Sequence, residues 1–494
     1  MQEFSNFCVN DDIQAEQGCE MQDIYCRKPL PHRQVESLSL LHIGQQVIFL
    51  NETGTRIWKL LDGTRNIADI ASLISRDHSS EPYQTIHAQV ESFIASLGKR
   101  GAIRRIGAAE PGVTPSAQEV TPSVVQQPVT SQKISSPIES NQAICMTPKK
   151  ADLKLDTIRD RIEQLYWKNS YIQKMHLELT YRCNFRCVHC YNATHTGAET
   201  EMSTLQWQSA LAQLAELGCH TVTFTGGEVF VRKDALELMQ TACDLGFSIL
   251  INTNGSLINE AMMQKLEPIR PFVQMAEVSF YGATSDIHDK LARRPGAYIN
   301  TLRALNLLKA AKFNVMAKFV TMRDNFDGIP KFEQDMQGLG VRYIVTSGVL
   351  IPKTNRDDSP LVQILTDEQY SQLLATRPDS ACSHGSTELK QCQPGHVRGA
   401  IAPDGSVSPC EWLTDFKLGN LKTQKLREVW YDTPFLDFRK VFEEESECPS
   451  CSLNPSCQRC PAMSYLETGH LQHCAPIPRH YAELHQQQLQ TIQS

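Results

Sequence analysis

Short apolar runs alternate with amphipathic stretches over the middle of the chain. Strand-like runs occupy residues 176–180, 221–225, 248–253, 273–280, 314–322 and 343–349, and helical stripes lie between them, for example at 205–217, 235–245 and 297–311. Six strand–helix alternations predict an α/β fold with a parallel sheet and right-handed crossovers. They fit a partial (β/α)6 barrel over residues 151–378. Because chemistry in such barrels lies at the C-terminal ends of the strands, we expect the functional residues there.

A different pattern precedes the barrel. Apolar runs at 38–43 and 47–50, with a turn at Gly44, predict two strands, and Asn51 is placed to cap the helix that follows. Apolar stripes at 57–61, 67–74 and 86–97 predict three short helices. These elements predict a small winged-helix-like α+β domain within residues 1–107. Such a domain can bind DNA, but no basic recognition helix is present to contact phosphates.

The remaining composition sets limits on location and partners. Residues 108–150 are rich in Pro, Ser, Thr and Gln and carry no apolar period, which predicts a flexible linker. The net charge of −7 gives no reason to expect nucleic-acid binding. No apolar run approaches the ~18 residues of a membrane span, and the N-terminus has no signal-peptide pattern. We therefore expect a cytoplasmic protein without nucleic-acid or membrane partners.

The cysteines indicate metal or redox chemistry. The chain has 17 of them, a density that in a large cytosolic protein is typical of metal sites. Cys183, Cys187 and Cys190 form a C-x₃-C-x₂-C loop after the first barrel strand, and seven more lie between residues 392 and 474. Thiolates suit iron–sulfur clusters and zinc. A structural zinc would take a fourth protein ligand, and His189, inside the loop, is poorly placed to close a tetrahedron.

The cysteine loop resembles the signature of the radical SAM enzymes, in which an aromatic residue also flanks the last cysteine. The resemblance implies a 4Fe–4S cluster on the three cysteines, with an open iron that binds S-adenosylmethionine (SAM). Family motifs follow the later strands, although Val229 replaces the usual Pro after Gly-Gly-Glu and Tyr281 replaces an Asp. The implied SAM-binding residues are Tyr191, Gly226, Gly227, Glu228, Asn254, Ser279, Arg293 and Arg294.

Residues 49–63 resemble the PqqD-type peptide-recognition domains. Those domains bind the leader of a ribosomally made precursor peptide as an added strand. The resemblance implies leader binding by the helix face at 83–97 and by Val47, Ile48, Phe49 and Leu50. A docking domain that binds no peptide is the alternative.

Residues 379–480 resemble the SPASM domain, which carries auxiliary iron–sulfur clusters, although the last internal spacing is one residue shorter than usual. The resemblance implies two 4Fe–4S clusters, the first held by Cys392, Cys410 and Cys460 and the second by Cys448, Cys451, Cys457 and Cys474. Seven thiolates cannot fill eight sites, so the first cluster has an open iron or takes Cys382 as its fourth ligand. Two zinc knuckles are the alternative. Residues 481–494 are expected to form a tail.

Together the resemblances imply a radical SAM oxidoreductase with three 4Fe–4S clusters. It would modify a precursor peptide through a 5′-deoxyadenosyl radical and form a thioether, C–C or C–O cross-link, with an electron donor such as flavodoxin or ferredoxin. One alternative is a radical SAM dehydrogenase or maturase of a protein side chain or a small molecule. Another is a non-enzymatic zinc-binding adaptor for peptides or DNA. The sequence shows no evident catalytic acid–base residue.

Overall fold

The computed structural model describes residues 24–28, 30–43, 46–76, 81–106, 158–197, 200–377, 394–443, 448, 450–453, 456–457 and 460–493. The predicted linker at 108–150 and the turn at Gly44 lie outside these ranges. Within them, no helix is both long enough and apolar enough to cross a membrane.

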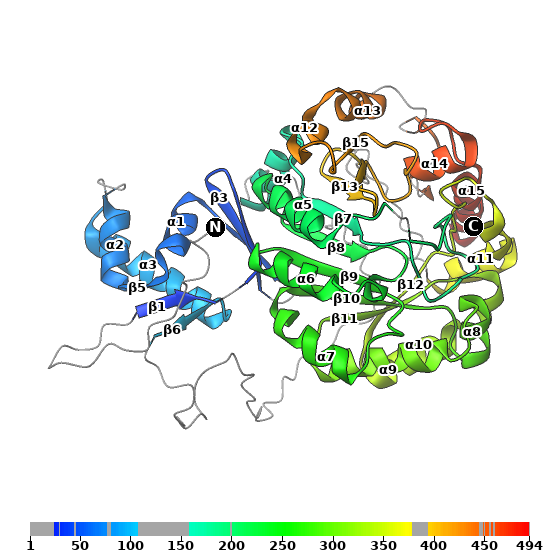
Figure 1. Cartoon of the computed structure of the whole chain (residues 1–494), viewed down its shortest axis with the longest axis horizontal. Helices are drawn as coiled ribbons and strands as arrows, with labels where there is room; N and C mark the ends of the chain where they lie inside the picture. Colours follow the sequence, from blue (N-terminus) through cyan, green and yellow to red (C-terminus); the bar gives the residue numbers. More distant parts are fainter. Residues whose placement is uncertain are drawn as a thin grey trace. The chain divides into compact units, whose positions relative to one another are not determined.

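The six predicted barrel strands form one parallel sheet. They are β7 (Lys174–Glu178), β8 (Thr221–Thr225), β9 (Ser248–Thr253), β10 (Val273–Phe280), β11 (Val315–Phe319) and β12 (Arg342–Val345), and they pair in sequence order. Helices cover the outer side of this curved sheet (Figure 1). They are α5 (Thr204–Glu216), α6 (Ala235–Asp244), α7 (Glu260–Leu266), α8 (Ser285–Ala292), α9 (Ala297–Ala310) and α10 (Ile329–Leu339). The predicted α/β fold and the partial parallel barrel are confirmed.

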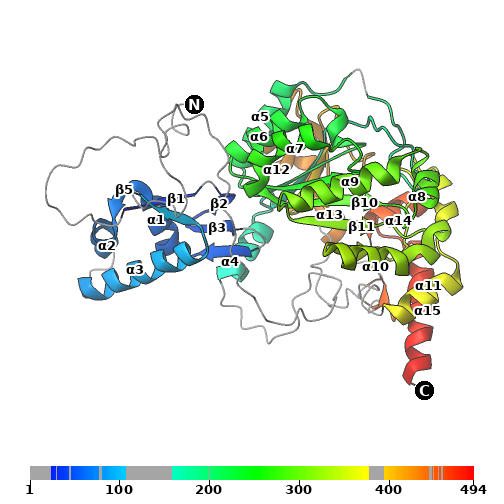
Figure 2. The same cartoon turned by 90° about the horizontal axis from the view of Figure 1, so that it is seen from below.

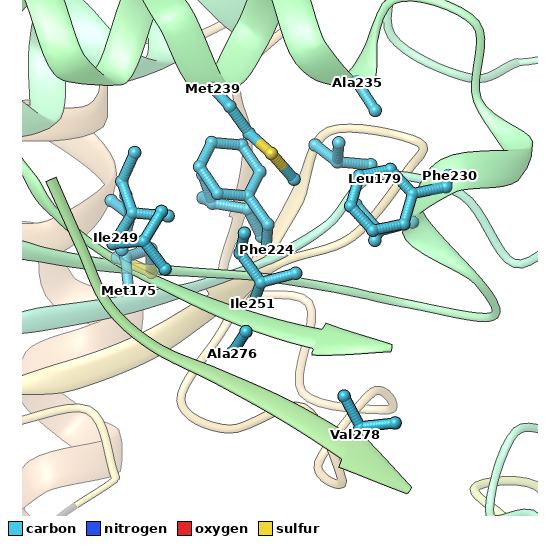
Figure 3. Close-up of a cluster of buried hydrophobic side chains, with 14 of the residues drawn as sticks. Met175, Leu179, Phe224, Phe230, Ala235, Met239, Ile249, Ile251, Ala276 and Val278 are labelled. Atoms are coloured by element: carbon cyan, nitrogen blue, oxygen red, sulfur yellow. The ribbon is translucent and has the colours of Figure 1, made fainter. Parts of the chain in front are cut away.

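The barrel core lies between the strands and their helices. Every residue of β8 is buried, because both faces of a parallel strand are covered. Figure 3 shows Met239 directed from α6 toward Phe224 of β8, with Ile249 and Ile251 of β9 beside them. Phe224 is fully buried. This packing fixes the strand ends that carry the predicted motifs.

The sheet continues beyond the barrel into the C-terminal part of the chain. Strand β13 (Arg398–Ile401) pairs in parallel with β7, and β14 (Ser406–Ser408) and β15 (Gly419–Asn420) follow it antiparallel, so the sheet has nine strands. The sequence analysis did not predict these strands, because all three are short and β13, which joins them to the barrel, pairs with a strand more than 200 residues away. The predicted SPASM region is therefore joined to the first barrel strand by backbone hydrogen bonds.

Further helices surround the C-terminal strands. They are α11 (Asp367–Thr376), α12 (Leu426–Tyr431), α13 (Thr433–Glu443), α14 (Pro461–Thr468) and α15 (Pro476–Gln493), and short 3-10 helices occur at Val229–Val231, Glu267–Phe272, Arg323–Gly328 and Ser359–Gln363. Residues 481–493, expected to be a tail, belong to α15, which lies beside α11 (Figure 2). The physical reason is burial: Tyr481 stacks on Tyr370 with ring centroids 3.9 Å apart.

The N-terminal elements divide between two compact units. One unit contains the sheet β5-β1-β6, formed by β1 (Ile24–Arg27), β5 (Asp62–Asn66) and β6 (Ile103–Arg105), with α1 (Glu52–Leu60), α2 (Ile67–Ser75) and α3 (Tyr83–Lys99). As predicted, Asn51 caps α1, accepting from the Gly54 amide at 2.8 Å. The predicted strands at 38–43 and 47–50 exist but belong to the other unit.

That second sheet groups with the barrel. It consists of β2 (His32–Val35), β3 (Leu38–Ile43) and β4 (Gln46–Leu50) in that order, and its apolar face packs on α4 (Ile158–Lys168). Leu38 and Leu40 contact the cluster around Ile162 and Tyr166. The sequence predicted one domain over residues 1–107; the burial of β3 against α4 explains why residues 30–50 join residues 158–493 instead.

Candidate metal, cofactor and substrate site

The cysteine loop begins where β7 ends. Cys183, Cys187 and Cys190 are free thiols and half-buried. A turn joins the Cys190 amide to the Cys187 carbonyl at 3.2 Å. The Arg186 and Val188 amides donate to carbonyls at the end of α8, each at 3.0 Å. The loop is therefore held by backbone contacts on a second barrel element, and the Cys183 sulfur accepts from the Phe185 amide at 3.4 Å.

The surroundings of these thiols fit a metal cluster. Burial raises the pKa of Cys183 to about 11 and raises the pKa values of Cys187 and Cys190. Thiolates at such positions need a compensating positive charge, which bound metal supplies. Among the described residues, no three His, Cys, Asp or Glu converge on a single metal ion. A four-iron cluster requires a wider arrangement, since each cysteine binds a different iron atom.

The glycine pair after β8 lets two backbone segments meet. Gly227 donates to the Thr180 carbonyl at 2.8 Å, and the Glu228 amide donates to the Arg182 carbonyl at 3.0 Å. A Cβ atom on Gly227 would lie 2.6 Å from the Tyr181 carbonyl oxygen and still closer to that of Arg182. The sequence predicted that these glycines admit a ligand. In the structure the absence of a side chain at these glycines allows close contact with the backbone that leads into the cysteine loop.

Glu228 connects three elements of the site. Its carboxylate accepts from the Phe230 amide at 3.2 Å, the Thr253 hydroxyl at 2.7 Å and the Asn254 amide at 2.8 Å. Burial raises its pKa, and these hydrogen bonds act in the opposite sense. A carboxylate has about four acceptor positions, so one remains for a ligand ammonium. Binding of SAM by Glu228 stays a prediction, and the hydrogen bonds of its carboxylate leave room for it.

Asn254 brings Glu228 together with the cysteine loop. Its side-chain amide donates to Asn184 at 3.0 Å and lies 4.0 Å from the Cys183 sulfur. Ser279 is half-buried near the end of β10. Tyr281, which follows that strand, packs on His189 with ring centroids 4.7 Å apart and belongs to an apolar cluster that Cys187 contacts. Tyr281 therefore contacts the loop itself, a contact that the sequence analysis did not predict.

The two arginines lie apart from these contacts. Arg293 and Arg294 are exposed after the end of α8, where Arg293 has a left-handed backbone with φ of 50°. They line a surface hollow together with Asp286, Asp289 and Lys290. The Arg186 and Val188 amides reach carbonyls of the same helix end, so the loop is near in the fold. The role of either guanidinium toward a SAM carboxylate stays a prediction.

The C-terminal cysteines gather in two places. Cys410 and Cys460 share one apolar cluster with Leu413 and Phe438. The Cys457 sulfur lies 4.0 Å from the Pro478 carbonyl, and Cys451 and Cys474 interact electrostatically with Arg479 of the same helix turn. The Cys448 carbonyl accepts from the Cys451 amide at 3.3 Å. The division of these cysteines into two cluster-binding sets stays a prediction, and Cys392 and Cys382 lie outside the described residues.

The expected leader-binding strand is an edge strand. Within the described ranges β4 pairs with β3 alone. Val47 is 37% exposed and Leu50 is 2% exposed. Ile48 is half-buried, and Phe49 packs on the cluster against α4. Side chains of this strand thus pack in the core at one end, and the described strands pair with it along one edge, as the predicted addition of a leader strand requires.

The structure also reveals functional candidates that sequence reasoning missed. Glu178, the last residue of β7, is 2% exposed and accepts from the hydroxyls of Tyr181 at 3.2 Å and Tyr191 at 3.5 Å. Tyr191 follows the last loop cysteine, so this carboxyl group lies one hydrogen bond from the cysteine loop. An acidic residue in a strand of the predicted barrel sheet was the available signal, because such residues are rarely buried without a partner or a function.

Three family models match the chain. Residues 177–335 match the radical SAM superfamily, residues 38–103 match the coenzyme PQQ synthesis protein D (PqqD) family, and residues 392–461 match the SPASM iron–sulfur cluster-binding domain. The chain is 28% identical over 325 residues to an AdoMet-dependent heme synthase of Methanosarcina barkeri, covering 59% of this chain and 92% of that protein. It is 27% identical over 299 residues to a PqqA peptide cyclase of Granulibacter bethesdensis, covering 56% and 78%.

Solved structures share the fold. Streptococcus suis SuiB bound to the precursor peptide SuiA aligns with a TM-score of 0.57 at 12% identity, covering 92% of this chain and all of that one. The enzyme anSMEcpe with bound AdoMet and a peptide aligns with a TM-score of 0.52 at 15% identity, covering 65% and 97%. The radical SAM and SPASM matches thus indicate an enzyme and support SAM and iron–sulfur clusters as its cofactors. It is a radical SAM enzyme with a PqqD domain and a SPASM domain.

Proposed function

We propose that this enzyme modifies a ribosomally synthesised precursor peptide and forms a thioether, C–C or C–O cross-link. The observation that carries the proposal is the presence of radical SAM, PqqD and SPASM domains in one chain. The similarity to a PqqA peptide cyclase supports a peptide substrate, as do two fold neighbours that were solved with bound peptides.

The proposed cofactors are SAM and three 4Fe–4S clusters. Cys183, Cys187 and Cys190 would hold the SAM-binding cluster, and the C-terminal cysteines would hold two auxiliary clusters. When bound, SAM and the first cluster supply a 5′-deoxyadenosyl radical for hydrogen abstraction from carbon. The chain itself orients this site: the glycine pair bonds the backbone that leads into the loop, Glu228 and Asn254 tie the next two strand ends to it, and the Tyr281 ring packs on His189 of the loop.

Leader binding is proposed for the open edge of β4. An extended peptide would add to the sheet β2-β3-β4 through main-chain hydrogen bonds. Val47 is exposed on this strand and offers the direct test, since a charge at an edge strand disfavours pairing.

We propose flavodoxin or ferredoxin as electron donor. We also propose a cytoplasmic location, because 17 cysteines in a large chain are more typical of metal sites than of a secreted disulfide framework.

A small-molecule substrate is the second candidate, because the similarity to heme synthases extends over most of those proteins. A PqqD domain is the feature that favours a peptide instead. The family matches favour either enzyme over a zinc adaptor.

The test is anaerobic reaction of the holoenzyme with SAM, reductant and a synthetic peptide encoded by a short reading frame beside its gene. Mass spectrometry should show 5′-deoxyadenosine and a peptide that has lost two hydrogen atoms. Cys183→Ala should abolish both products, and Val47→Asp should weaken leader binding without lowering iron content. The full enzyme should hold about twelve irons. Modification of a tetrapyrrole with no change in any peptide would overturn the proposal.

A further inference from the structure

A polar cavity lies between the cysteine loop and the C-terminal strands. It measures about 250 Å³, less than the ~300–1,000 Å³ of pockets that enclose a whole ligand. It therefore has room for a single side chain. The walls come from β7, from the residues after Cys190, from the segment after β12 and from the β13–β15 region; they include Glu178, Tyr191, Asn192, Asp404, Glu411 and Asp415.

The cavity has a buried floor and an exposed rim. Glu178 is 2% exposed and Asn192 is 7% exposed, whereas Thr194, Asp415 and Lys417 are exposed at the surface. A chain that lies across the rim can therefore send one side chain inward. Because Tyr191 lines the cavity and follows Cys190, that side chain would end near the cysteine loop.

Most charges of the cavity have partners. Asp404 pairs with Lys417 at 3.1 Å, and Glu411 lies 3.4 Å from Nδ1 of His176, whose pKa burial lowers to about 4. Glu178 has only its two tyrosine hydroxyl donors, and no Lys, Arg or His of the described residues lies within ion-pair distance of it. Burial, and next the Glu411 carboxylate, raise the pKa of Glu178 to about 8. A cation bound beside Glu178 would offset this and restore the carboxylate.

Asn192 provides an independent observation. Its side-chain oxygen accepts from the Thr194 amide at 3.1 Å, but its side-chain nitrogen has no acceptor among the described residues and is buried. A buried donor without an acceptor costs roughly 1–3 kcal/mol. A ligand that carries a carbonyl oxygen would satisfy it. The cavity thus combines an acceptor for a cation with a donor for a carbonyl group.

We infer that this cavity binds a lysine or arginine residue of the substrate peptide, with the cationic head at Glu178 and the peptide carbonyl at the Asn192 amide. The inference rests on the proposed peptide substrate and adds a specificity site to it. A free amine alone would use only Glu178, and an uncharged residue would use only Asn192. A peptide residue with a basic side chain uses both groups.

The test is calorimetric titration of anaerobic, SAM-loaded holoenzyme with two small probes. N-acetyl-lysine N-methylamide carries the charge, and N-acetyl-norleucine N-methylamide is its uncharged counterpart. The lysine probe should bind at least tenfold more tightly. Glu178→Gln should remove this preference, while Glu216→Gln, which changes an exposed carboxylate at the end of α5, should keep it. Equal binding of the two probes to the wild type would overturn the inference.

A second variant separates binding from folding. Asn192→Leu should weaken both probes by a similar factor and leave the lysine preference intact, because it removes the carbonyl contact alone. Unchanged binding by this variant would refute the assigned role of Asn192. Iron content and SAM affinity should stay at wild-type values in both variants. If the lysine probe does not bind although a precursor peptide is modified, the cavity assignment fails alone; if it binds and no peptide is modified, the proposed function fails alone.

Discussion

Replacing Gly227 by alanine places a methyl group 2.6 Å from the Tyr181 carbonyl oxygen and closer still to that of Arg182. An ordinary contact of 3.4 Å requires the two segments to separate by at least about 0.8 Å, the shift that relieves the longer of these two contacts. The hydrogen bond from Gly227 to Thr180, now 2.8 Å, would then exceed hydrogen-bond length, and the neighbouring bond from Glu228 to Arg182 would stretch with it. With about 1–3 kcal/mol for each buried group left unpaired, we expect a destabilisation of roughly 2–6 kcal/mol.

The displaced segment leads directly into the cysteine loop, so the variant should also lose function at the metal site. We expect Gly227→Ala to lose about four irons per chain after reconstitution and to bind SAM much more weakly. Iron analysis, SAM binding by equilibrium dialysis and the urea midpoint measure these effects.

The matched control is Gly338→Ala in α10. A Cβ atom there meets nothing within 4 Å, and the residue is exposed in a helix. This variant should therefore gain about 0.5–1 kcal/mol and keep all its iron. If Gly227→Ala kept wild-type iron content, SAM affinity and urea midpoint, the argument from backbone contact would be refuted.

Three other perturbations test the core, a helix cap and a buried charge. Phe224→Ala should cost about 3–5 kcal/mol in the urea midpoint, whereas Leu205→Ala, at a residue 77% exposed, should stay within about 0.5 kcal/mol; similar costs would contradict the assigned core. Asn51→Ala should lower the opening free energy of the first turn of α1, measured by hydrogen exchange, by about 1 kcal/mol, because the Gly54 amide loses its acceptor. Asn51→Ser should restore the protection. Burial raises the pKa of Glu178 from 4.5 to about 8, so between about pH 6.5 and 8 the folded chain keeps a proton that the unfolded chain has released, and stability falls as pH rises. Glu178→Gln cannot titrate, so the stability of this variant minus that of the wild type should rise by about 1–2 kcal/mol between about pH 6.5 and 8. A stability difference that does not change with pH would contradict the assigned pKa of Glu178.

Local patterns determined much of what could be predicted. The spacing of Cys183, Cys187 and Cys190 lies within one loop, and the barrel strands are short segments rich in apolar residues between helical stripes, so both are visible in a single stretch of sequence. Asn51 caps α1 as expected, since a cap depends only on the next few residues. Placement of the motifs at the C-terminal strand ends followed from the parallel topology.

Only the tertiary structure decided the contacts that join distant segments. No local pattern shows that β13 pairs with β7, or that β3 packs on α4 rather than on the helices that follow it. The same holds for Glu178, which looks like one polar residue in a strand until the tyrosine hydroxyls and Glu411 surround it. Such contacts depend on the registration of strands far apart in the chain. The sequence by itself therefore determined the metal-binding chemistry and the barrel, and the packing of the C-terminal strands on β7 decided the cavity beside them.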